Sequence, residues 1–160
     1  MPIINTISGD LLDLFAQQKY TAIAHGCNTF ANFGAGIALS IKEKYPLAYE
    51  ADKSSYKSLR NSLGWYSFYT LPSNQIIYNL YTQDSLGWNK KHEAPPVDYT
   101  AIYRAFLKLN GLHKSDKNFL LGIPSLIGCG LAKGDPTIVR ALINLATPDI
   151  DIEEVIYDKN

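Results

Sequence analysis

The chain has 160 residues, which is enough for one domain of ordinary size that needs no metal or disulfide to be stable. Its fifteen Lys and Arg residues balance its fifteen Asp and Glu residues, so the net charge favours neither a nucleic-acid backbone nor an anionic membrane as a partner. Cys27 and Cys129 are too few and too far apart for a zinc framework, and the sequence shows neither an apolar signal segment nor a membrane span. We therefore expect a soluble, cytoplasmic, monomeric protein with reduced thiols, one domain over residues 1–160, and no metal or cofactor.

Short apolar strands alternate with helical patterns along the first third of the chain, which favours α/β layers over a helical bundle or a β-sandwich. Residues 2–8 predict an opening strand and residues 20–27 a buried one. A helix beginning at Asp10 is predicted to face inward with Leu11, Leu14 and Phe15. A second helix, with Ile37, Ile41 and Tyr45 on one face, is predicted to end before Pro46.

The rest of the chain predicts a hairpin, a loop and two more helices. Residues 64–71 and 75–81 resemble two strands joined by a turn at 72–74, and residues 85–97 resemble a loop. Residues 118–123 predict another buried strand, and residues 154–157 a strand that closes the sheet. The inward positions expected on the two helices are Ile102, Ala105, Phe106 and Leu109 on the first, and Ile138, Leu142 and Leu145 on a helix starting near Pro136.

The most informative stretch, residues 28–37, places an asparagine and a Gly-x-Gly turn between a strand and a helix. Gly34 and Gly36 lack the side chains that would keep the backbone from a phosphate, and the following helix directs its unpaired amides and dipole to the same spot. This arrangement is typical of a diphosphate site. A Rossmann site is a competing interpretation, but it expects a third glycine where Leu39 stands and a shorter loop. An ordinary glycine turn is the other alternative.

A second glycine-containing loop, residues 124–131, also follows a predicted strand. In an open α/β sheet both loops fall at the carboxyl ends of strands, where ligands bind, so together they could clamp one ligand.

Four motifs in this order and spacing resemble the macro domains that bind ADP-ribose, in particular the branch with ADP-ribose 1″-phosphate phosphatases and ADP-ribosyl-glutamate hydrolases. The resemblance covers nearly the whole chain and implies a three-layer α/β/α fold with a mixed, mostly parallel central sheet. The motifs are Ser8-Gly9-Asp10-Leu11, Ala24-His25-Gly26-Cys27-Asn28, Phe33-Gly34-Ala35-Gly36-Ile37-Ala38 and Gly128-Cys129-Gly130-Leu131.

The resemblance implies ADP-ribose or a derivative as the ligand. Asp10 would accept a hydrogen bond from the adenine amino group, the Leu11 amide would meet a ring nitrogen, and Asn28 would contact the distal ribose. Tyr157 would pack on the adenine face. The residues alone leave simpler roles open: a helix N-cap for Asp10, a turn for Asn28 and plain packing for Tyr157. The amides implied to bind phosphates and the distal ribose are those of Gly34, Ala35, Gly36 and Ile37, and of Gly128, Cys129, Gly130 and Leu131.

The candidate catalytic residues are Asn28, His25 and Asp135. His25 is a candidate general base or orienting group, with a packed core histidine as the alternative. Asp135 could hold the distal ribose or a water, and Pro136 after it predicts a helix N-cap.

Relatives that hydrolyse glutamate-linked ADP-ribose carry an aspartate where Ala132 stands and a lysine where residues 82–84 read Thr-Gln-Asp, so a lysyl-adduct mechanism is not expected. Lys90, Lys91 and His92 could contact a terminal phosphate or be solvated loop residues, and Trp88 could contact the ligand or pack under the loop.

The activity expected from this resemblance is hydrolysis of ADP-ribose 1″-phosphate by a water held among Asn28, His25 and the loop amides. Two alternatives remain at this level: removal of ADP-ribose from a modified protein or nucleobase, and recognition of ADP-ribose or a nucleotide-like messenger without catalysis.

Overall fold

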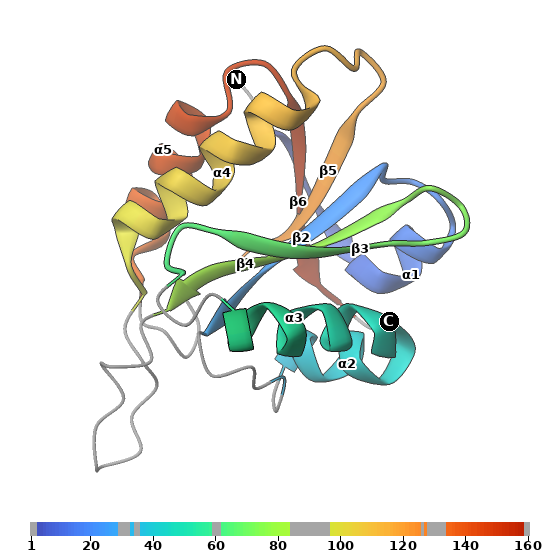
Figure 1. Ribbon diagram of the computed structural model, residues 1–160. Coiled ribbons are helices and arrows are strands. Elements are labelled where there is room, and N and C mark those ends of the chain that lie inside the picture. Colours follow the sequence, from blue (N-terminus) through green and yellow to red (C-terminus); the bar gives the residue numbers. More distant parts are fainter. Residues whose placement is uncertain are drawn as a thin grey trace.

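The computed structural model describes residues 3–28, 33, 36–58, 62–83, 97–125, 127 and 134–158 (Figure 1). These residues form a six-stranded sheet in the order β1-β6-β5-β2-β4-β3 with helices on both faces. The elements in chain order are β1 (Ile3–Gly9), α1 (Leu11–Ala16), β2 (Ala22–Asn28), α2 (Gly36–Lys44), α3 (Pro46–Ser58), β3 (Tyr66–Thr70), β4 (Ile76–Gln83), α4 (Tyr99–His113), β5 (Leu120–Pro124), α5 (Pro136–Ala146) and β6 (Asp151–Tyr157).

The sheet is mixed and mostly parallel, as predicted. The pairs β1–β6, β6–β5, β5–β2 and β2–β4 are parallel, and only the edge strand β3 runs antiparallel to its neighbour β4. The predicted hairpin is therefore confirmed, and Asn74 in its turn has the positive φ (72°) that asparagine tolerates.

The last strand corrects one expectation. Instead of closing the sheet, β6 inserts between β1 and β5 and leaves β1 at the edge. Buried carboxylates on β6 stabilise this arrangement: Glu153 accepts hydrogen bonds from the Asn5 amide and the Tyr20 hydroxyl, at 3.2 and 2.6 Å, and Glu154 accepts from Arg140 at 2.8 Å. The order of strands depends on such long-range contacts, which a local pattern does not encode.

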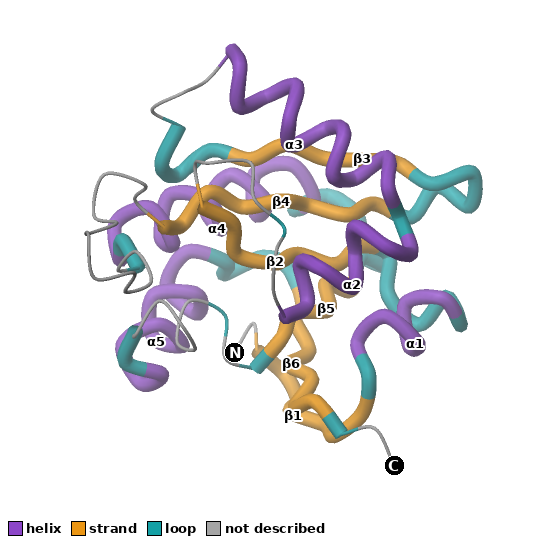
Figure 2. The backbone as a smooth tube through the Cα atoms, turned by 90° about the horizontal axis from the view of Figure 1, so that it is seen from below, coloured by secondary structure: helices purple, strands orange, loops and turns teal. Residues whose placement is uncertain are grey.

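Two apolar cores lie on opposite faces of the sheet. Helices α4 and α5 cover one face, and α1, α2 and α3 cover the other (Figures 1 and 2). Side chains alternate along the strands, so Ala22 and Ala24 of β2 point towards α4 and α5, whereas Ile23 and Cys27 point towards α2 and α3. The three-layer α/β/α architecture follows from this alternation.

Helix α3 was not predicted. Pro46 was interpreted as the end of the preceding helix, and α2 does end at Lys44, but the same proline begins the next helix. Proline suits a first helical turn because its missing N–H has no partner there anyway. The Ala48 amide donates to the Tyr45 carbonyl at 2.9 Å across the junction.

The inward face of α5 also differs from the prediction. Val139, Ile143 and Ala146 are buried, whereas Ile138 and Leu145 are exposed and Leu142 is half-buried. Each set has helical spacing, and both are apolar, so periodicity alone could not select the face. On α4 the predicted inward residues Ile102, Ala105, Phe106 and Leu109 are all buried.

Across the ranges that the structure describes, each helix falls short of the length and apolar character that crossing a membrane requires.

Candidate functional site

The carboxyl ends of the parallel strands place the predicted site residues along one edge of the sheet. β1 ends at Gly9 directly before Asp10, β2 ends at Asn28, β5 ends at Pro124 and β6 ends at Tyr157. Parallel pairing puts all these ends on the same side, and helices α1, α2, α4 and α5 begin there. Backbone amides at helix N-termini and strand-end side chains therefore meet at one edge, the usual position of ligands in open α/β sheets.

Asp10 and Tyr157 lie at one corner of this edge. Asp10 is the N-cap of α1, because its Oδ1 accepts hydrogen bonds from the amides of Leu12 and Asp13, at 2.9 and 3.2 Å. Tyr157 is in register with Gly9, and the next amide, that of Asp158, donates to the Gly9 carbonyl at 2.8 Å. The Tyr157 side chain is 65% exposed, so it is a surface ring at the end of β6 and not a core residue.

Asn28 lies further along the edge, at a bulge between β2 and β4. The register shifts after Cys27, so that Asn28 stands opposite Gln83. Gln83 also bridges Val97 just before α4. Trp88, Lys90, Lys91 and His92 belong to the segment between those two residues, which lies outside the described residues, so their predicted roles stay predictions.

The first glycine loop ends at α2. Gly36 is its first residue, with a φ of 59° that favours glycine, and a Cβ built there would meet no described atom within 4 Å. The open space beside Gly36 is where a bound group could approach the backbone. Ile37 packs partly against the core beneath α2, which holds its amide at the helix start. Gly34 and Ala35 lie outside the described residues.

The second glycine loop is fixed at both ends. At its start, the Ile127 side chain is buried in the core under α4 and α5. At its end, Asp135 caps α5 through a 2.9 Å hydrogen bond from the Thr137 amide to Oδ1, which confirms the predicted cap, and the Asp135 amide donates to the Tyr99 hydroxyl at 3.0 Å. The residues between, including Gly128, Cys129, Gly130, Leu131 and Ala132, lie outside the described ranges.

His25 is not at the open edge. Its imidazole is 1% exposed, its Nε2 lies 2.7 Å from Asn79 Oδ1, and burial lowers the pKa of the ring to about 4. The ring is therefore neutral at physiological pH. A buried ring held by an amide agrees with the packed alternative and does not present a base to a substrate.

The sequence alone assigns no role to three buried residues, Phe33, Asn79 and Asp52. Phe33 and Asn79 lie against the His25 ring, and Asp52 belongs to α3. Asn79 and Asp52 are fully buried, and Phe33 is 2% exposed. The available signal was a polar residue inside an apolar strand at Asn79, and an aromatic residue directly before Gly34.

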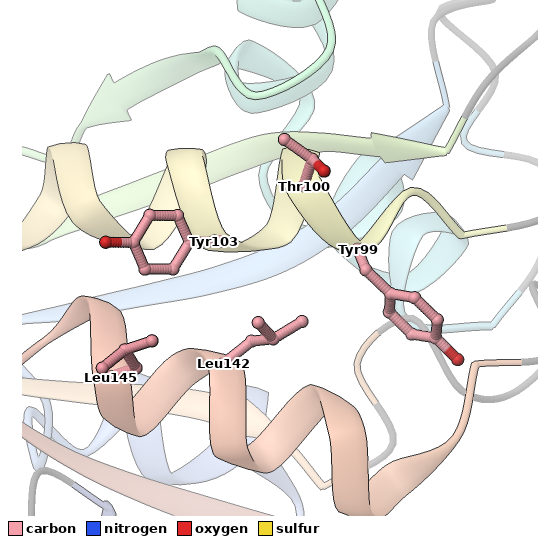
Figure 3. Close-up of a pocket in the computed structure, with 5 residues that line it drawn as sticks. All are labelled: Tyr99, Thr100, Tyr103, Leu142 and Leu145. Carbon is pink, nitrogen blue, oxygen red and sulfur yellow. The ribbon is translucent and has the colours of Figure 1, made fainter.

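A pocket between α4 and α5 is separate from the predicted site. Its lining side chains are Tyr99, Thr100, Tyr103, Leu142 and Leu145, and within the described ranges none of the predicted ligand-binding residues contributes to it (Figure 3). Tyr99 connects the two: its hydroxyl points away from Tyr103 (Figure 3), and it accepts the hydrogen bond from the Asp135 amide.

Comparison with known sequences gives relatives over nearly the full chain. No protein-family model matches it. The chain is 31% identical over 156 residues to an uncharacterised 17.5 kDa protein of Enterobacteria phage T4, and the match covers 94% of each protein. It is 25% identical over 138 residues to an ADP-ribose 1″-phosphate phosphatase of Aspergillus fumigatus, covering 86% of this chain and 64% of the phosphatase. The corresponding phosphatase of Aspergillus clavatus is 23% identical, with 93% of this chain and 70% of that protein covered.

Solved structures share the fold at low identity. A protein from Bacteroides thetaiotaomicron superposes with a TM-score of 0.80 at 24% identity, covering 95% of this chain and 98% of the other. The macrodomain of Mycobacterium tuberculosis DarG superposes with a TM-score of 0.76 at 22% sequence identity, covering 95% of this chain and 97% of the other. Thermosipho africanus DarTG, solved in complex with ADP-ribose, superposes with a TM-score of 0.74 at 18% identity, covering 98% of this chain and 42% of that one. The chain therefore has the macrodomain fold, and its sequence is distantly related to ADP-ribose 1″-phosphate phosphatases.

Proposed function

We propose that the protein binds ADP-ribose along the carboxyl edge of its sheet. One observation carries the proposal: parallel pairing brings Asp10, Asn28, Gly36 and Tyr157 to the same edge from three separate parts of the chain. Adenine would bind at the corner of Asp10 and Tyr157, with the diphosphate at the start of α2 and the distal ribose at Asn28. The related phosphatases and the ADP-ribose complex of a similar fold support this assignment.

The proposed reaction is hydrolysis of ADP-ribose 1″-phosphate. Water attacks phosphorus, the bond from phosphorus to the 1″ oxygen breaks, and ADP-ribose and inorganic phosphate leave. Amides of the glycine loops would stabilise the charge that develops on the phosphoryl oxygens, and Asn28 and Asp135 would orient the distal ribose or the water. The distant relationship to the Aspergillus ADP-ribose 1″-phosphate phosphatases supports this finer assignment.

Recognition without turnover is the second candidate. The burial of His25 favours it, because this histidine, the predicted general base, has no exposed nitrogen with which to activate water.

Calorimetry with ADP-ribose tests binding, and phosphate release from ADP-ribose 1″-phosphate tests catalysis. Gly36→Glu should abolish detectable binding, because the side chain would enter the open space beside the backbone with a charge of the same sign as the diphosphate. Gly111→Glu is the control for adding a charged side chain at an open position, because a Cβ there also meets no described atom within 4 Å. Gly111 lies near the C-terminal end of α4, whereas the proposed site is at the edge where α4 begins. A folded Gly36→Glu protein with wild-type affinity would contradict the proposed site.

Phosphate release by the wild-type protein separates the two candidate functions, and Asn28→Ala tests the hydrolytic one. If the protein hydrolyses the 1″-phosphate, we expect kcat of Asn28→Ala to fall roughly 100-fold or more, because the site loses the group that orients the distal ribose. Wild-type protein that binds ADP-ribose tightly but releases no phosphate would leave recognition as the function.

A further inference from the structure

We propose that His25 and Asn79 are positioning residues that set the first glycine loop in place through Phe33; this inference rests on the proposed ADP-ribose site and assigns His25 no direct part in catalysis. The three side chains form a continuous series from strand β4, through β2, to the residue that precedes Gly34.

The amide of Asn79 is fixed by three hydrogen bonds. Its Nδ2 donates to the Ala48 carbonyl of α3 and to the Ser67 hydroxyl of β3, at 3.0 Å in both cases. Because a carbonyl can only accept, the group facing Ala48 must be the NH₂ group, and Oδ1 must face His25. Asn79 thus ties β4 to a helix and to the edge strand and presents one oriented acceptor to the histidine.

This orientation also determines the tautomer of His25. Both hydrogens of the Asn79 NH₂ group are used, so Oδ1 accepts and the His25 Nε2, at 2.7 Å, carries the proton. Nδ1 of the neutral ring keeps its lone pair, and the Cys27 sulfur lies 3.7 Å from Nδ1 and 3.6 Å from Nε2. Burial raises the pKa of the Cys27 thiol, so this neighbour stays protonated.

Phe33 is the connection to the loop. Its ring packs edge-to-face on the His25 ring, with centroids 5.1 Å apart and planes at 89°. It also packs against the ring of Tyr49 of α3, with a centroid distance of 5.1 Å. Only 2% of Phe33 is exposed. A buried ring held on two sides fixes the backbone at position 33, immediately before Gly34 and three residues before Gly36, so a shift of the imidazole would move the amides proposed to bind the diphosphate.

The test is a double-mutant cycle on ADP-ribose affinity. His25→Gln keeps a donor for Asn79 but removes the ring under Phe33, and Phe33→Leu removes the aromatic contacts from the loop side. We expect either change to weaken binding roughly 3- to 10-fold, in line with the worth of an aromatic pair. The double variant should bind no more weakly than the weaker single variant, because both changes break the same connection.

His113→Gln is the matched control. The His113 ring also lies against an aromatic ring, with its centroid 3.9 Å from that of Phe119, and its Nε2 lies 2.6 Å from the Tyr78 hydroxyl. Unlike His25, it belongs to the last turn of α4, away from the proposed site. It should lower stability without changing ADP-ribose affinity. In the absence of ligand, hydrogen exchange at the Phe33 and Gly36 amides should accelerate in His25→Gln and not in His113→Gln.

Three results would overturn the inference: wild-type affinity in folded His25→Gln, losses that multiply in the double variant, or a changed pH profile of kcat with an unchanged Kd, which would make His25 an acid or base. Should His25→Gln fail to fold, Phe33→Leu tests the inference by itself. Unchanged ADP-ribose affinity in Phe33→Leu would show that Phe33 does not link His25 to the glycine loop. A wild-type protein that does not bind ADP-ribose defeats the proposed function instead, and the exchange measurement still tests the positioning role.

Discussion

The two faces of the sheet are built differently. Under α4 and α5 the core cluster is apolar and aromatic, and buried polar residues on that side, such as Glu154 and Asn110, pair with Arg140 and Asp149. Under α2 and α3 the core contains His25, Asn79 and Asp52, none more than 1% exposed. Because its core includes these three side chains, we call the face that carries the first glycine loop the polar face and the other the apolar face.

This difference indicates that one face mainly stabilises the fold, whereas the other also fixes the position of the residues next to the first glycine loop. Apolar packing stabilises without fixing one orientation of a side chain, whereas a satisfied hydrogen-bond network specifies one geometry at a cost in desolvation. The network from His25 through Asn79 and Ser67 to the Tyr81 hydroxyl lies next to the loop, where the proposed ligand demands accurate placement of amides. We expect changes on the α4–α5 face to affect mainly stability, and changes on the other face to affect stability and binding together.

The largest expected effect is on the apolar face. Phe106 is fully buried between α4 and the sheet, so Phe106→Ala should lower the free energy of unfolding by about 3 to 5 kcal/mol through lost burial and a cavity. Urea denaturation measures the loss, and ADP-ribose affinity of the folded fraction should not change. A loss below about 1 kcal/mol would show that this face is not the main source of stability.

A smaller loss is expected from Asn79→Ala on the polar face. The substitution leaves the His25 Nε2–H without its partner and removes one of the two hydrogen bonds of the Ser67 hydroxyl, which should cost roughly 2 kcal/mol. Unlike Phe106→Ala, it should also weaken ADP-ribose binding, because the imidazole under Phe33 loses its orientation. Equal affinities in the two folded variants would remove the distinction between the faces.

An effect of similar size is a change in how stability depends on pH. Asp52 of α3 is fully buried, neither carboxylate oxygen has a hydrogen-bond partner among the described residues, and burial raises the pKa from 3.8 to about 6, which the nearby Tyr81 hydroxyl only partly offsets. Between these values the folded state binds more protons than the unfolded state, so this group lowers stability as pH rises from about 4 to about 6. His25 has the opposite effect: its pKa falls from 6.5 to about 4, so the unfolded state binds more protons and stability increases with pH over nearly the same interval.

In the wild-type protein, the pH dependences of stability due to Asp52 and His25 oppose each other. Asp52→Asn should therefore leave the pH dependence due to His25 visible. Relative to wild type, the free energy of unfolding of Asp52→Asn should increase by roughly 2 kcal/mol on going from about pH 4 to about pH 7. His25→Gln should show the reverse trend. Denaturant titrations at several pH values measure both, and parallel curves for wild type and Asp52→Asn would mean that Asp52 titrates normally.

Local features of the sequence determined the elements and their ends. The start of α2 at Gly36, the caps at Asp10 and Asp135 and the hairpin turn at Asn74 each depend on a few neighbouring residues, because capping and turn chemistry are short-range. The parallel sheet and the gathering of Asp10, Asn28 and Tyr157 at one edge were also predictable, since alternating strands and helices place strand ends on the same side.

Only the tertiary structure decided what depends on distant contacts. It selected which of two apolar stripes of α5 is buried, inserted β6 between β1 and β5, and began α3 at the proline interpreted as a helix end. It also turned His25 inward, since the side of a strand that a polar residue occupies is set by alternation and by the partner it finds, here Asn79 from 54 positions further along the chain. The free energy of burying a polar side chain depends on whether it finds such a hydrogen-bond partner. Its neighbours in the sequence do not indicate which distant residue that partner will be.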